Sequence, residues 1–190
     1  MPAPMKLQAT WEALASAPHR LFFLGGACQG VASVLWWLLD LSGRFAGFYP
    51  SPSWTIPPVW AHAYLMIYGF FPFFIFGFLF TFLPNWLDAE RLPSRHYLSS
   101  FFATASGTVL FYVGLIFDKS ILLLAVLLIL SGWGMGAVAL LRMLLPARSP
   151  EKVHLSLIVF FVIFGEAGSL SFCFWLLTNR SIWLDFTDVV

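Results

Sequence analysis

Charged side chains are scarce in this sequence. Asp, Glu, Lys and Arg make up only 10% of its 190 residues, whereas hydrophobic types make up 60%. Soluble globular proteins carry about 25% charged residues, so this chain has too few charges to cover a water-facing surface. The net charge of +1 also gives no sign of the basic patches that bind nucleic acid. The composition therefore excludes a soluble domain of any size, argues against a nucleic-acid partner, and indicates a protein of the lipid bilayer.

Cysteine is scarce as well, and only two are present, Cys28 and Cys173. They fall in different hydrophobic stretches and at different expected depths, Cys28 in the inner leaflet and Cys173 in the outer one. A disulfide between them is therefore not expected, and each is predicted to be a buried apolar thiol. The first 18 residues lack the continuous apolar core of a signal peptide, so we expect the first hydrophobic stretch to be retained as a helix.

Long apolar runs are abundant. A spanning helix needs about 20 largely apolar residues, and five stretches are long enough: Leu21–Leu41, Val59–Leu83, Tyr97–Phe117, Ile121–Leu145 and Val153–Thr178. Runs such as Ile121–Leu130 do not show the alternation of barrel strands. The predicted fold class is all-α, an integral membrane bundle of five transmembrane helices. We expect an N-terminal segment over residues 1–20, a transmembrane domain over 21–178 and an outer C-terminal tail over 179–190.

The distribution of basic residues predicts the orientation. Lys and Arg are enriched on the cytoplasmic side of membrane proteins. The N-terminus and the second and fourth connections share one side and hold Lys6, Arg20, Arg91, Arg95, Arg142, Arg148 and Lys152. The other side holds Arg44, Lys119 and Arg180. We therefore predict a cytoplasmic N-terminus, and the short turn at Lys119 predicts that the third and fourth helices form an antiparallel hairpin.

Glycine and phenylalanine suggest how the helices pack. Helices in lipid associate where small residues let their backbones approach, and Gly132 and Gly136 lie one turn apart in the fourth stretch. We predict that this helix packs through them. The second stretch is dense in phenylalanine between Phe70 and Phe82 and contains Pro72, which is expected to bend it. Its rings could line a flat cofactor or simply face lipid and neighbouring helices, and composition favours the second interpretation.

Four side chains could carry chemistry or bind metal. Ionisable groups inside the hydrocarbon are costly and are functional candidates. Glu166, deep in the fifth stretch, could be a proton relay, a metal ligand or a partner for a cation, or simply a neutral acid hydrogen-bonded between helices. His62 lies near the outer start of the second stretch, where an imidazole can bind haem iron or copper. Met66 follows one turn later on the same face, and Cys173 comes from the fifth stretch at a similar depth.

Several motifs resemble a known family. These are Pro18-His19-Arg20-Leu21-Phe22-Phe23-Leu24, Ile56-Pro57-Pro58-Val59-Trp60 followed by His62, Tyr68-Gly69-Phe70, and Gly77-Phe78-Leu79-Phe80-Thr81-Phe82-Leu83-Pro84-Asn85-Trp86. They resemble the N-terminal part of the NnrS family, bacterial membrane proteins that contain haem and copper and are linked to nitric oxide metabolism. The specific resemblance covers residues 18–86, and beyond it only hydropathy and spacing agree. Family members are about twice as long, with roughly twelve helices.

The residues and the resemblance together leave two versions of the function open, and the resemblance implies a bacterial inner membrane protein. The family reads His-Ala-His-Glu-Met where this chain reads His62-Ala63-Tyr64-Leu65-Met66, so the first histidine and the methionine are kept. One version is a haem b- or copper-binding protein of nitric oxide or respiratory physiology, with His62 and Met66 at the cofactor and Cys173 as a further metal ligand. The alternative is a non-catalytic accessory subunit docked on a larger respiratory or photosynthetic complex. We expect the chain alone either to bind no metal or to share a site completed by another membrane subunit.

Overall fold

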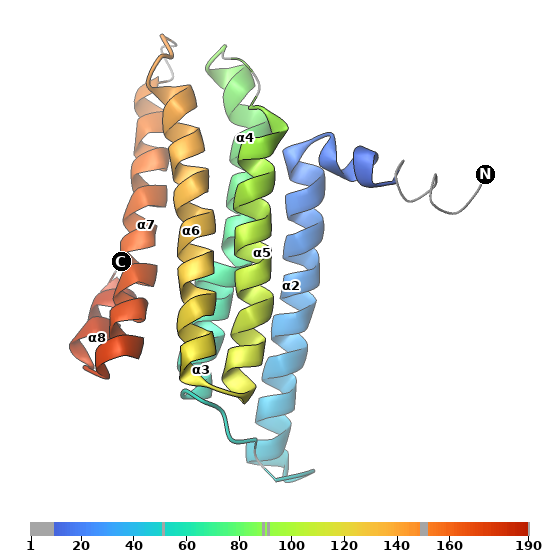
Figure 1. Cartoon of the computed structure of the whole chain (residues 1–190), viewed down its shortest axis with the longest axis vertical. Helices are drawn as coiled ribbons and strands as arrows, with labels where there is room; N and C mark the ends of the chain where they lie inside the picture. Colours follow the sequence, from blue (N-terminus) through green and yellow to red (C-terminus); the bar gives the residue numbers. More distant parts are fainter. Residues whose placement is uncertain (1–9, 51, 89, 91, 149–151, 190) are drawn as a thin grey trace.

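The chain folds as a bundle of long helices (Figure 1). The computed structural model describes residues 10–50, 52–88, 90, 92–148 and 152–189, and all the regular elements in these ranges are helices. After a helical stretch at residues 10–15 they are, in chain order, α2 (Pro18–Leu41), η1 (Ser42–Ala46), α3 (Pro58–Tyr64), η2 (Leu65–Phe70), α4 (Phe71–Trp86), α5 (Ser94–Ile116), α6 (Lys119–Leu144), α7 (Lys152–Thr178) and α8 (Ile182–Val189), with η1 and η2 in π-helical form.

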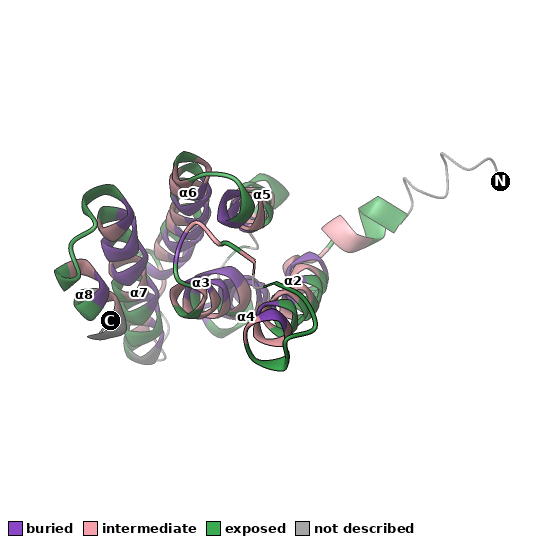
Figure 2. Cartoon of the chain, turned by 90° about the horizontal axis from the view of Figure 1, so that it is seen from below, coloured by how far each residue is buried: buried purple, intermediate pink, exposed green. Residues whose placement is uncertain are grey.

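The predicted membrane bundle is confirmed. Five spans are long and apolar enough to cross a membrane: residues 18–46, 58–86, 94–116, 119–144 and 155–178. The first is α2 continued by η1, and the second is the unbroken succession of α3, η2 and α4. Seen from one end, buried residues lie between the helices and exposed ones face outward (Figure 2). The predicted orientation and the domain limits stay predictions, and residues 1–9 and 190 lie outside the described part.

Helices α5 and α6 form the most extensive pair, as the predicted hairpin requires. The connection is short because Asp118 caps α6, its side chain accepting a hydrogen bond from the Ser120 backbone N–H at 2.7 Å. At mid-helix the hydroxyl of Ser100 donates to the backbone oxygen of Gly132 at 2.7 Å. A Cβ atom on Gly132 would lie 2.7 Å from the backbone nitrogen of Thr104, so α5 can approach this closely only because residue 132 has no side chain.

Helix α6 also packs on α4 through the second predicted glycine. A Cβ atom on Gly136 would lie 2.6 Å from the Phe76 ring, and that ring is fully buried. The two glycines therefore face different neighbours, α5 at Gly132 and α4 at Gly136, and α6 lies in contact with both.

The phenylalanines of α4 divide between neighbouring helices and the outer surface, with Phe73, Phe76 and Phe80 buried and Phe71, Phe78 and Phe82 exposed. The Phe22 ring of α2 lies edge-on to Phe80 of α4 at 5.7 Å and to Phe101 of α5 at 5.3 Å between centroids. Phe74 fills the space left by Gly26 of α2. Pro72 has no N–H to donate to the preceding turn, and the helix meets it with the wider π-helical turns of η2 directly before α4.

The predictions for the two cysteines have different outcomes. Both are free thiols, so no disulfide joins them. Cys173 is buried as predicted, but the prediction of a buried Cys28 is wrong, because Cys28 is exposed. It lies on the outward face of α2, which turns its small residue Gly26 inward instead. A thiol is apolar enough to face lipid, so hydropathy alone could not place it.

Past the last span the chain turns back on itself. Helix α8 lies along α7, and the two are drawn side by side at the end of the bundle where α3 begins (Figure 1). The hydroxyl of Ser171 donates to the backbone oxygen of Trp183 at 2.6 Å, and the rings of Trp183 and Phe174 stack at 5.1 Å. Residues of the C-terminal segment thus contact the membrane-spanning part of α7.

Candidate functional site

His62 lies on the side of α3 that faces α2. Pro58 begins α3, as suits a residue with no N–H to contribute to the first turn, and His62 is one turn further on. Its imidazole stacks on the indole of Trp37, with the centroids 4.4 Å apart and the planes 15° from parallel. The Nδ1 atom of His62 is buried and has no hydrogen-bond partner. A buried nitrogen with a free lone pair is costly unless a donor or a cation meets it.

Met66 faces α2 as well. The hydroxyl of Ser33 donates to its sulfur atom at 3.5 Å. Ser33 and Trp37 are one turn apart on α2, as Met66 and His62 are on the opposing helix, and positions four apart share a helix face. The predicted His62 and Met66 therefore lie on one face of the second span, and both contact α2.

A polar row continues this contact toward the middle of the membrane. Gln29, one turn before Ser33, is buried and donates from its amide nitrogen to the Tyr112 hydroxyl of α5 at 3.0 Å. Gln29, Ser33 and Trp37 thus recur every four positions along a mainly apolar stretch of α2. This four-residue spacing could have revealed the polar row from the sequence, but the sequence analysis considered only the length of the apolar stretch.

Asp40 is a second polar position that the sequence analysis missed. It is fully buried, its carboxylate forms a salt bridge with Arg44, and it accepts a hydrogen bond from the Trp54 indole N–H at 2.8 Å. The pair at i and i+4 continues α2 into η1. The carboxylate therefore joins the end of α2 to the connection that leads into α3, and so supports the position of His62.

Cys173 is on the other side of α3. It follows Phe172 on α7, and the Phe172 ring stacks on Tyr64 at 4.3 Å. Tyr64 also shares a 2.8 Å hydrogen bond with Ser169 of α7. Residues two apart point to nearly opposite sides of a helix, so His62 faces α2 where Tyr64 faces α7. The structure thus does not bring Cys173 to His62.

Glu166 lines an open groove between α6 and α7. The groove has a volume of about 540 Å³, and its other walls are apolar apart from Ser131. The carboxylate lies against Gly134, where an added Cβ would be 2.9 Å from the Glu166 oxygen. Among the described residues none forms a hydrogen bond or an ion pair with it. Gly134 of α6 has no side chain and so leaves room for this carboxylate, while Ala167 of α7 lines the same groove.

Two of the motifs named above meet at the far end of the bundle. The His19 ring nitrogen lies 3.3 Å from the Thr81 hydroxyl. A cavity of about 250 Å³ is bounded there by Pro18, His19, Pro84 and Asn85, among others. Segments more than 60 positions apart in the sequence therefore form one structural feature.

A comparison with family models decides the relationship. The model described as "NnrS protein" matches residues 13–187. The chain belongs to the NnrS family. The match runs through all five spans, so membership extends well beyond the motif-bearing residues 18–86. No match was found among curated proteins or among solved structures.

Proposed function

We propose that this NnrS-family protein acts in nitric oxide or respiratory physiology at the bacterial inner membrane, where His62 and Met66 hold a copper(I) ion. The observation that carries this proposal is the buried Nδ1 atom of His62, which lacks a hydrogen-bond partner on the same face as the Met66 thioether. Imidazole and thioether are both suitable ligands of copper(I). The metal would supply binding or redox chemistry toward a small ligand.

The donor set fits a single ion better than a haem. Two axial haem ligands approach the iron from opposite faces, whereas His62 and Met66 leave one face of one helix. A copper(I) ion can accept both from the same side. His62 as a whole is half-buried, and a further ligand from another membrane subunit would complete the site.

Copper(I) titration of the purified full chain tests the proposal. Under anaerobic reducing conditions, competition with a chromophoric copper(I) chelator should show one copper per chain. His62→Ala and Met66→Leu should each weaken binding at least about tenfold, the scale set by losing one of a few ligands. His96→Ala, which removes an imidazole at the other end of the bundle, is the matched control and should bind as the parent does.

The competing function is a non-catalytic accessory subunit. It predicts that the chain takes up no stoichiometric copper, or that His62→Ala and His96→Ala weaken copper(I) binding equally. An absorption spectrum tests whether His62 binds haem instead of copper. A strong Soret band that disappears in His62→Ala would replace copper with haem and require a second axial ligand from elsewhere.

A further inference from the structure

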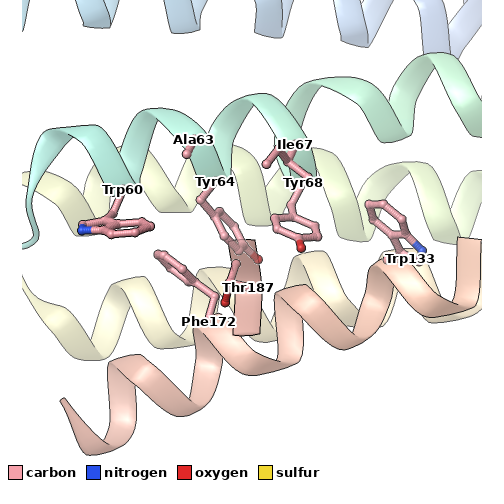
Figure 3. Close-up of a pocket in the computed structure, with 9 residues that line it drawn as sticks. Trp60, Ala63, Tyr64, Ile67, Tyr68, Trp133, Phe172 and Thr187 are labelled. Atoms are coloured by element: carbon pink, nitrogen blue, oxygen red, sulfur yellow. The ribbon is translucent and has the colours of Figure 1, made fainter. Parts of the chain in front are cut away.

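A second cavity lies on the opposite side of α3 from His62. It has a volume of about 260 Å³ between α3, η2, α6, α7 and α8. Its walls are mostly aromatic rings, and the close-up shows them around one space (Figure 3). Its lining includes Ala63, Tyr64, Tyr68, Trp133, Phe172 and Thr187.

The aromatic walls are held in place by their neighbours. The Tyr64 ring lies between Phe111 at 5.0 Å and Phe172 at 4.3 Å, and its hydroxyl is bonded to Ser169. Trp133 donates its indole N–H to the backbone oxygen of Val162 at 2.7 Å. These polar groups are already satisfied, so the rings present flat apolar faces to the cavity.

Tyr68 differs from the other walls. Its side chain is only 2% exposed, and its hydroxyl points into the space between η2 and α7 (Figure 3). In the part of the chain that the structure describes, no residue hydrogen-bonds to that hydroxyl. The cavity therefore has one hydroxyl, on Tyr68, that can still donate a hydrogen bond to a ligand.

The size and the entrance limit what the ligand is. An apolar cavity of about 150 Å³ holds benzene, and drug-sized ligands use about 300–1,000 Å³, so this cavity suits one substituted ring. The neighbouring Ile67 is 45% exposed on the outer surface of the bundle, which places the entrance toward lipid. The ligand must therefore dissolve in the bilayer.

We propose that this cavity binds the ring of a quinone, with a ring carbonyl accepting a hydrogen bond from the Tyr68 hydroxyl. A quinone ring is planar and can stack on the aromatic walls at the usual 4.5–7 Å. Its carbonyl gives the hydroxyl a partner, which an acyl chain lying in the same space does not. The other two hydroxyls of the wall already have partners, Ser169 for Tyr64 and the backbone oxygens of Trp183 and Gly168 for Thr187. The site is independent of the proposed copper position.

A pair of matched probes tests the proposal. Duroquinone and durene carry the same four methyl groups on one ring, and only duroquinone has carbonyls. The full chain in nanodiscs is titrated with each by calorimetry, with empty nanodiscs subtracted. Duroquinone should bind saturably with one site per chain. Tyr68→Phe should weaken it about three- to tenfold, the value of one hydrogen bond, and should leave any durene binding unchanged.

Two further variants make the outcome decisive. Tyr97→Phe removes a hydroxyl that donates to Ala15 outside the cavity, and should bind duroquinone as the parent does. Ala63→Leu fills the cavity and should abolish binding. Tyr68→Phe loses only an unpaired hydroxyl, so it should fold with an unchanged or higher melting temperature. Equal duroquinone affinity in Tyr68→Phe and Tyr97→Phe, or no saturable heat, would overturn the proposal in favour of a lipid chain.

Discussion

Replacing Gly132 with alanine tests how α5 and α6 are held together. The added methyl carbon would lie 2.7 Å from the backbone nitrogen of Thr104 and 3.0 Å from the backbone oxygen of Ser100. Backbone atoms inside a helix cannot rotate away as a side chain can. The two helices must therefore separate, and the 2.7 Å bond from the Ser100 hydroxyl to the Gly132 oxygen must lengthen or break.

The magnitude follows from these two losses. Overpacking a tight contact costs about 1–3 kcal/mol, and a buried hydrogen bond contributes about 1 kcal/mol. We therefore expect Gly132→Ala to lower the free energy of unfolding by about 2–4 kcal/mol. At about 2–4 °C per kcal/mol for a chain of this size, the melting temperature should fall by about 4–16 °C.

Thermal unfolding of the purified chain in one detergent is the assay. Gly134→Ala is the matched control on the same helix. Its methyl would lie 2.9 Å from the Glu166 carboxylate, the far end of a flexible side chain that borders an open groove and can move. The control should melt close to the parent. Melting of Gly132→Ala within 2 °C of Gly134→Ala would refute the close backbone contact described here.

Two further predictions concern acidic residues. Asp40→Ala should lower the free energy of unfolding by about 2–4 kcal/mol, because it leaves Arg44 and the Trp54 indole without their buried acceptor. The control Asp185→Ala, at an exposed carboxylate, should leave the melting temperature unchanged. Equal melting temperatures of the two variants would contradict the role given to Asp40. The backbone N–H of Ser120 holds the pKa of Asp118 below its ordinary value of 3.8, so the cap on α6 is fully present above pH 3.8 and is lost as the pH falls through the lower folded-state value. The melting temperature should therefore fall in that acid range for the parent but less for Asp118→Asn, and parallel pH profiles would speak against the cap.

The helical architecture could be predicted because it depends on apolar length. Lipid offers no partners to bare backbone groups, so each long apolar stretch had to become a helix. The hairpin at Asp118 was equally accessible, because a tight turn leaves two adjacent helices no other arrangement. The first span extends to Ala46, beyond the predicted Leu41, because the Asp40–Arg44 pair lies across the expected boundary.

The environment of individual side chains was harder to predict. Sequence spacing placed His62 and Met66 on one face, yet it could not say which helix that face meets. The cavity beside Tyr68 depends on α8 folding back against α7, and nothing in the composition of residues 179–190 fixes that direction. Such features depend on rotation about helix axes and on long-range contacts, which hydropathy does not record.

The π-helix η2 has a consequence for the rotational phase of the second span. A π turn accommodates one residue more than an α turn, and one residue corresponds to about 100° around a helix axis. This extra residue turns α3 relative to α4, so that His62 meets α2 while Tyr64 meets α7. A relative without it would need a one-residue gap here before its histidines could be compared with His62. Deleting one residue from Leu65–Phe70 should likewise swing His62 away from Trp37 and leave the packing of α4 intact.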